Sequence, residues 1–195
     1  DDAVFKKDMF TYYDDGDIAK HLPSMNVFTS VDLAISKEEH ADYTVITTIA
    51  VNSDNHWFIL NQDVSKSSMS ETVNRLFGQI SKYKPTLLVL ETVAYQMAFK
   101  QVVEEEMLRR NSFTRIEKTR KMKKELKIQS LQPRYNIQSI HHPKGKDWIN
   151  GLEEQLTMFR PEGALTKHDD QIDCLSMLDE FAYAPSNYST NSDEY

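Results

Sequence analysis

Three groups of acidic residues occupy positions in the chain where carboxylates are unusual. Asp32 ends an apolar, strand-like run, Glu91 ends another, and the segment 167–173 (KHDDQID) opens a helical pattern that carries Asp170 and Asp173. An ionised carboxylate at the end of a buried strand costs desolvation free energy unless something compensates its charge. Three such places in one small domain suggest that the carboxylates converge on a hard divalent cation, which prefers oxygen ligands.

Each acidic position also has a structural interpretation when it is taken alone. Asp32 could be a turn residue that hydrogen-bonds to nearby backbone, and Glu91 could be a buried glutamate satisfied by a neighbouring hydroxyl. Helix capping is the stronger interpretation of the aspartates at 169–173 alone. Asp170 and Asp173 are three residues apart, however, so they share one helix face and could hold one ion between them. Together, the three positions favour a metal centre.

The composition indicates one globular domain of 195 residues, with 39% hydrophobic residues and two tryptophans. The net charge of −7 argues against electrostatic wrapping of nucleic acid, so any DNA contact must be local or assisted by cations. No apolar run approaches the roughly 20 residues of a membrane span, and the N-terminus lacks signal-peptide architecture. Cys174 is the single cysteine, which excludes an internal disulfide and indicates a reducing cytosol and a role in the core.

The elements that must position the carboxylates follow from the hydrophobic pattern. Apolar and β-branched runs predict strands at 26–35, 42–51, 56–64 and 86–91. Helical spacing predicts helices at 67–83, 95–109, 147–159 and 169–183, with shorter extended pieces at FTRIEK and 136–142. The turn NSDN predicts an antiparallel hairpin between the second and third strands. The result is an α/β domain on a mixed sheet, whose parallel first and fourth strands would bring Asp32 and Glu91 to one edge.

The two ends of the chain are predicted to lie outside this domain, which spans 26–184. Residues 1–25 contain acidic and aromatic residues without sustained periodicity, and we interpret them as a lead-in or linker. The tail 185–195 is polar and poor in aliphatic residues, which predicts disorder.

One segment, 118–134, is densely basic in an otherwise acidic chain, and part of it is predicted to be helical. A solvated helix face explains such a segment as well as a phosphate-binding surface beside the metal site does. The candidate DNA-binding residues are Lys118, Arg120, Lys121, Lys123, Lys124, Lys127 and Arg134. The following segment 141–147 (HHPKGKD) is interpreted as a mobile loop that could gate the cleft.

Four motifs resemble the nuclease domain of phage terminase large subunits, and they stand in that family's order. They are VDLAISKEEHADYTVI, LLVLET, KMKKELKIQSLQPRYNI and KHDDQIDCLSML. The resemblance implies an RNase H-like fold and two-metal cleavage of double-stranded DNA with Mg²⁺ or Mn²⁺. It implies that Asp32, Glu91 and Asp170 are the catalytic, metal-binding carboxylates, that Asp173 is a supporting ligand and that Asp169 caps the helix.

The resemblance also implies partners that this chain does not contain. Complete large subunits join such a nuclease to an ATPase, whereas no GxxxxGK[ST] phosphate loop is present here. Residues 1–25 would then lead in from a missing ATPase domain, and the small terminase subunit and the portal would be further partners. The expected substrate is concatemeric viral DNA, cut in the host cytoplasm with little sequence specificity and no membrane involved.

Two other functions remain open from the sequence. One is another RNase H-like nuclease, such as a Holliday-junction resolvase or a transposase. The other is a non-catalytic DNA-binding or docking module in which the acidic cluster has only a structural role.

Overall fold

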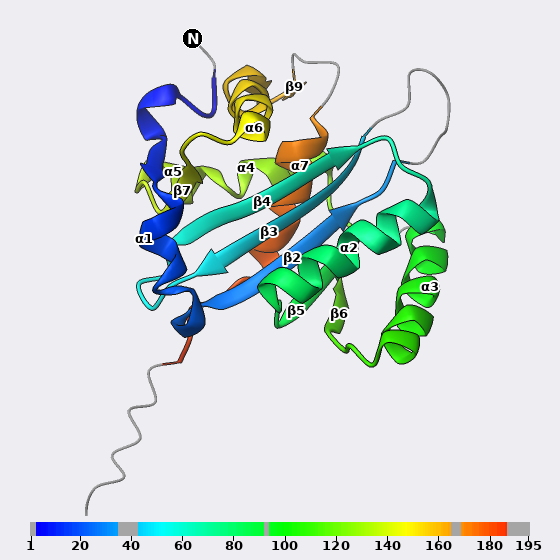
Figure 1. Ribbon diagram of the computed structural model, residues 1–195. Helices are drawn as coiled ribbons and strands as arrows, with labels where there is room; N and C mark the ends of the chain where they lie inside the picture. Colours follow the sequence, from blue (N-terminus) through cyan, green and yellow to red (C-terminus); the bar gives the residue numbers. More distant parts are fainter. Residues whose placement is uncertain (1–2, 35–42, 92–93, 165–168, 187–195) are drawn as a thin grey trace, which may run out of the picture.

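A mixed sheet of seven strands forms the centre of the computed structural model, which describes residues 3–34, 43–91, 94–164 and 169–186. Its strands in chain order are β1 (Thr11–Tyr13), β2 (Asn26–Asp32), β3 (Thr44–Val51), β4 (Trp57–Ser65), β5 (Leu87–Leu90), β6 (Arg115–Lys118) and β7 (Ile140–Pro143). Across the sheet the order is β1-β7-β4-β3-β2-β5-β6, with helices over both faces (Figure 1). This is the mixed sheet flanked by helices that the sequence predicts.

The strands β2, β3 and β4 form the expected antiparallel meander. Asp32 lies opposite Val45 at one end of the β2–β3 ladder, and Val51 lies opposite Trp57 where β3 turns into β4. Every residue of β3 is buried because both faces of the sheet are covered, which explains its continuous β-branched sequence.

The remaining strands are parallel to their neighbours, and this brings two of the candidate carboxylates together. β5 pairs with β2 so that Leu90 lies opposite Val31. Asp32 and Glu91 are the next residues along these two strands, so they follow side by side at the carboxyl edge of the sheet. β6 pairs with β5 on the far side, while β7 joins β4 to β1.

One face of the sheet is covered by α2 (Met69–Tyr83) and α3 (Ala94–Arg110) (Figure 1). α2 begins at Ser68, whose hydroxyl accepts from the Glu71 amide while the Glu71 carboxylate accepts from the Ser68 amide. This capping box satisfies two amides that have no partner within the helix. The apolar stripe of α2 then packs against Val31, Ile46, Leu88 and Leu90 of the sheet.

The other face carries the helices from the C-terminal half of the chain (Figure 1). They are α4 (Lys124–Gln129), α5 (Gln132–Asn136), α6 (Asp147–Met158) and α7 (Asp170–Ser176), which continues into the 3-10 helix η3 (Met177–Glu180). The short strands β8 (Phe159–Arg160) and β9 (Gly163–Ala164) pair with each other after α6. None of the described helices is both long enough and apolar enough to cross a membrane.

The N-terminal segment, predicted to be a linker, is built into the domain as far as the structure describes it. It forms η1 (Lys7–Met9), β1, α1 (Asp15–Ala19) and η2 (Leu22–Ser24). Phe5 is fully buried, with its ring edge against Tyr135, and the Tyr13 hydroxyl donates to the Ile59 carbonyl. The buried residues of this segment are spaced irregularly along the chain, so the sequence shows neither helical nor strand periodicity there.

The interpretation of residues 141–147 as a mobile gate is wrong. His141, His142 and Pro143 belong to β7, which lies between β4 and β1 in the sheet, and His142 is fully buried. The extended piece predicted at 136–142 overlaps β7 at Ile140–His142, whereas the basic residues and the glycine that follow suggested a loop. The predicted disordered tail lies outside the described residues from 187 onward.

Candidate active site

The alternation of side chains along β2 and β5 directs Asp32 and Glu91 to the same face of the sheet. On β2, Ser30 faces α7, because its hydroxyl donates to the Cys174 carbonyl at 2.7 Å. Asp32 is two residues further along and so points to that same side. On β5, Val89 packs in the core cluster that contains α7 residues, and Glu91 again follows two residues later. Both carboxylates therefore face the start of α7.

The first turn of α7 contributes Asp170 and Asp173, and each is only 5% exposed. Asp170 Oδ2 accepts a hydrogen bond from the Tyr43 amide at 3.2 Å. Asp169 stands at the N-cap position, but its side chain caps no amide of the helix, contrary to the capping role predicted for it. The start of α7 thus lies where the prediction places Asp170 and Asp173, next to the ends of β2 and β5. Asp169 does not cap the helix but pairs with Lys124.

Two lysines of α4 lie among these carboxylates. Lys127 Nζ is 2.5 Å from Glu91 Oε1 and 2.8 Å from Asp173 Oδ1. Lys124 Nζ is 2.7 Å from Asp169 Oδ1 and 3.2 Å from Asp173 Oδ2. Lysines three residues apart share one face of a helix, so α4 presents both ammonium groups together. The Lys127 side chain is only 11% exposed, which makes its two ion pairs largely buried.

The electrostatics of the cluster reflect this crowding of charge. Burial raises the pKa of Asp32 well above its usual range, and the negative charges of Asp173 and Glu91 raise it further. Burial also opposes the charged forms of Lys124 and Lys127. The carboxylates of Asp173 and of Asp169 (for Lys124) or Glu91 (for Lys127) together outweigh it and hold the pKa of both lysines above the usual range. The site therefore stabilises positive charge strongly and tolerates additional negative charge poorly.

The donor atoms of this site fit a hard divalent cation such as Mg²⁺ or Mn²⁺. All of them are carboxylate oxygens, and the buried Asp173 Oδ1 accepts no hydrogen bond, although Lys127 lies within ion-pair distance. As the side chains stand, no three Asp, Glu, His or Cys residues in the described part of the chain are arranged to hold a metal ion. Lys127 makes the contacts to Glu91 and Asp173 that a shared cation would make.

The basic residues predicted to form one DNA-binding surface fall into different environments. Arg120 pairs with Glu180 at 2.8 Å, and Arg134 pairs with Asp179 while its guanidinium lies over the Trp57 ring. Lys118 is partly buried, whereas Lys121 and Lys123 are exposed. Lys124 and Lys127 belong to the carboxylate cluster, a role that the sequence analysis missed. Their spacing of three on a helix was the available signal, but it does not identify the partner.

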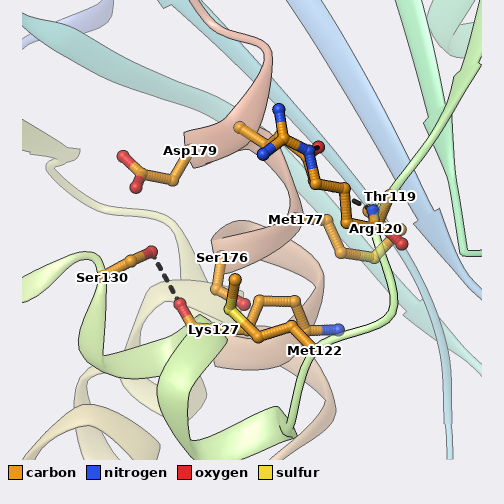
Figure 2. Close-up of a pocket in the computed structure, with 9 residues that line it drawn as sticks. Thr119, Arg120, Met122, Lys127, Ser130, Ser176, Met177 and Asp179 are labelled. Carbon is orange, nitrogen blue, oxygen red and sulfur yellow. Dashed lines mark hydrogen bonds and ion pairs between the residues drawn. The ribbon is translucent and has the colours of Figure 1, made fainter.

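A pocket of about 320 Å³ has Lys127 in its lining (Figure 2). Lys127 belongs to both places, and the Ser130 hydroxyl on the pocket wall donates to the Lys127 carbonyl at 2.8 Å. Other lining residues come from the segment before α4 and from the end of α7, including Thr119, Met122, Ser176 and Met177. The cluster therefore borders a hollow large enough for part of a ligand.

No protein-family model and no curated protein matches the sequence. Solved structures do match. The large terminase nuclease from thermophilic phage G20c is 16% identical with a TM-score of 0.63, and the match covers 94% of this chain and 100% of that chain. Another structure of that nuclease contains bound magnesium and gives 17% identity, a TM-score of 0.62 and coverage of 92% and 97%.

Two further large terminases show the same likeness. The nuclease domain of gp2 from bacterial virus Sf6 is 10% identical with a TM-score of 0.63, and the match covers 94% of this chain and 100% of that chain. The HK97 bacteriophage large terminase is 9% identical with a TM-score of 0.60, and the match covers 81% of this chain but 40% of that one. The present chain thus has the fold of large terminase nuclease domains.

Proposed function

We propose that this protein is a metal-dependent endonuclease that cuts double-stranded DNA during viral genome packaging. The observation that carries the proposal is that Asp32, Glu91 and Asp173 lie close together at the carboxyl edge of the sheet, with Asp170 on the same turn of α7 as Asp173. Carboxylates gathered in this way need positive charge, and the fold is one that terminase nuclease domains share. Cleavage of concatemeric DNA with little sequence preference is the corresponding activity.

In this proposal the four carboxylates hold two divalent ions, either Mg²⁺ or Mn²⁺. Such ions supply an activated water and stabilise the leaving 3′ oxygen in phosphodiester hydrolysis. Asp32 and Glu91 present their carboxylates from the ends of paired strands, while Asp170 and Asp173 present theirs from the first turn of α7. Lys124 and Lys127 compensate part of the negative charge of the cluster, and a bound metal ion would compete with them for Glu91 and Asp173.

The DNA backbone would approach from the side of α4 and the segment that precedes it. Lys121 and Lys123 are exposed there, and contacts from lysines to phosphates carry no sequence information. We extend the proposal to a terminase ATPase domain, a small terminase subunit and a portal as partners. The partial coverage of the HK97 large terminase is consistent with a nuclease that works within a longer chain.

One observation favours a second candidate function. Because Lys124 and Lys127 form ion pairs with Glu91, Asp169 and Asp173, part of the carboxylate charge is compensated without metal. A docking or DNA-binding module with this fold could therefore use the cluster only for structural purposes.

Cleavage of supercoiled plasmid distinguishes the two functions. The wild-type chain is incubated with Mn²⁺, Mg²⁺ or EDTA beside Asp32→Asn and Asp170→Asn, each checked for folding by circular dichroism. Nicking and linearisation that need metal and are lost in both variants support the nuclease. Asp54→Asn, an exposed aspartate in the β3–β4 turn, is the matched control and should cleave normally. Folded wild-type protein that cuts with neither metal would favour the docking module.

A further inference from the structure

The first turn of α7 takes its cap from a different helix. The amides at the start of a helix have no partner within it, and Asp169 supplies no side-chain cap here. Instead, Gln155 Oε1 on α6 accepts hydrogen bonds from the Gln171 amide at 2.9 Å and from the Ile172 amide at 3.1 Å. The two capped amides lie between Asp170 and Asp173 in the chain, so this contact fixes the backbone that carries both carboxylates.

Side-chain hydrogen bonds tie the same turn to the sheet. Gln171 Nε2 donates to Gln62 Oε1 and to the Trp148 carbonyl, both at 2.9 Å. Gln62 on β4 is 2% exposed, and its own Nε2 donates to Thr47 Oγ1 at 2.9 Å and to the Gln171 carbonyl at 3.0 Å. Buried amides with this many partners have little freedom to move. The turn is thus held by α6, β4 and β3 together.

A glycine allows α6 to come close enough for this arrangement. A Cβ atom added at Gly151 would lie 2.3 Å from Gln171 Oε1, which is far inside van der Waals contact. Glycine within a helix costs about 1 kcal/mol relative to alanine, so its presence in α6 has a packing reason. The close approach of α6 at Gly151 brings Gln155 within hydrogen-bonding distance of the first turn of α7.

We propose that Gln155 is a positioning residue for the carboxylates of α7 and that it sets their affinity for a divalent cation. This inference rests on the proposed function. A glutamine suits the position because its neutral oxygen caps both amides without adding negative charge near Asp170 and Asp173. Groups that orient metal ligands in this way change metal affinity by about 10- to 100-fold when they are replaced.

The test is Mn²⁺ binding measured by isothermal titration calorimetry, together with plasmid cleavage, at a temperature where every variant is folded. Gln155→Met keeps the length of the side chain but removes the acceptor, and it should weaken Mn²⁺ binding by about 10- to 100-fold. Gln155→Glu keeps the acceptor but adds a negative charge near Asp170 and Asp173, so its Mn²⁺ affinity should not fall as that of Gln155→Met does. Glu154→Met, at an exposed position on the same helix, is the matched control and should bind Mn²⁺ normally.

The outcomes separate this inference from the proposed function. A purely structural role would lower the melting temperature of Q155M and leave its Mn²⁺ affinity unchanged, which would overturn the inference while the wild type still binds and cleaves. A wild type that neither binds Mn²⁺ nor cleaves would overturn both. If Q155M does not fold, the test is the rate of amide hydrogen exchange of Gln171 and Ile172 in the wild type, measured with and without Mn²⁺. Exchange that Mn²⁺ slows supports the inference, and exchange that Mn²⁺ leaves unchanged overturns it.

Discussion

Two clusters of polar side chains lie at different places along the same sheet, and their polar groups are compensated in different ways. The carboxylate site consists of Asp32, Glu91, Asp170, Asp173, Lys124 and Lys127. The histidine edge consists of Thr11 on β1, His141 and His142 on β7, His56 directly before β4, Tyr135 on α5 and Glu153 on α6. In the first, ammonium groups neutralise carboxylates. In the second, both ring nitrogens of His141 and of His142 have hydrogen-bonding partners.

The histidine edge has all its hydrogen-bonding partners within the protein, whereas the carboxylate site could exchange its lysine ammonium groups for a metal ion. His142 is satisfied by Glu153 at 2.8 Å and by the Tyr135 hydroxyl at 3.0 Å, and all these partners belong to the fold. The carboxylates instead need positive charge beside them. A metal ion could supply that charge in place of a lysine ammonium group. Histidine is the commoner metal ligand in general, yet here the carboxylates are the better candidate for metal binding.

The largest expected effect comes from removing the buried cation of the carboxylate site. Lys127→Met should lower the free energy of unfolding in EDTA by about 3 kcal/mol, because Glu91 and Asp173 lose their common partner. Mn²⁺ should restore most of that loss, since a ligand that binds only the folded state stabilises it. Urea denaturation with EDTA and with Mn²⁺ measures both. Lys123→Met, at an exposed position, should change stability by less than about 0.5 kcal/mol.

If K127M were as stable as the wild type in EDTA, the lysine would not be the counter-charge of the site. If Mn²⁺ stabilised K127M no more than K123M, the carboxylates would not exchange one cation for another.

A smaller effect that does not depend on metal is expected at the histidine edge. Tyr135→Phe removes the hydroxyl that pairs with His142 Nε2 inside the core, and should cost about 1–2 kcal/mol. The same urea measurement should give equal losses with EDTA and with Mn²⁺. Tyr183→Phe makes the same chemical change at an exposed side chain and should be nearly neutral. A loss in Y135F that Mn²⁺ restores would remove the contrast between the two clusters.

The smallest effect is a pH dependence at His141. Burial, with the charges of His56 and His142, lowers its pKa from 6.5 to about 4. Between those values the unfolded chain binds a proton that the folded protein does not, so stability falls as the pH is lowered from about 6.5 toward 4. Because the ring is partly exposed, we expect a contribution of about 1 kcal/mol between pH 7 and pH 5. His141→Gln should flatten this slope in urea titrations, and identical slopes would contradict the assignment.

The sequence predicted the parts of the fold and site that depend on local pattern. Apolar runs located β2 and β5, and their parallel pairing places Asp32 beside Glu91 as expected. Helical spacing predicted a helix at 67–83, which the structure has as α2 (Met69–Tyr83). Helical spacing put Asp170 and Asp173 on one turn. In each case the residues that carry the signal are close together in the chain or follow a regular period.

The features that the sequence could not supply depend on which elements meet in space. Lys127 became a candidate for DNA binding because its own segment is basic, and only the packing of α4 against α7 shows that it pairs with Asp173. Nothing in the sequence distinguishes Gln155 or Gln62 from other polar residues, because their contacts with Gln171 arise only from the packing of α6 and β4. Gly151 in a predicted helix was a usable signal of close packing, but it does not say what packs there.

The first strand of the sheet also has a mechanical consequence. β1 pairs with β7 in parallel, from Thr11 opposite His141 to Tyr13 opposite Pro143, and Phe5 is locked into the core ahead of it. A pulling force applied before Phe5 would therefore act first on the buried Phe5 side chain. It would then act along the hydrogen bonds between β1 and β7, in shear. A slack tether would absorb such a pull, whereas this segment passes it to β7 and, through β7, to β4.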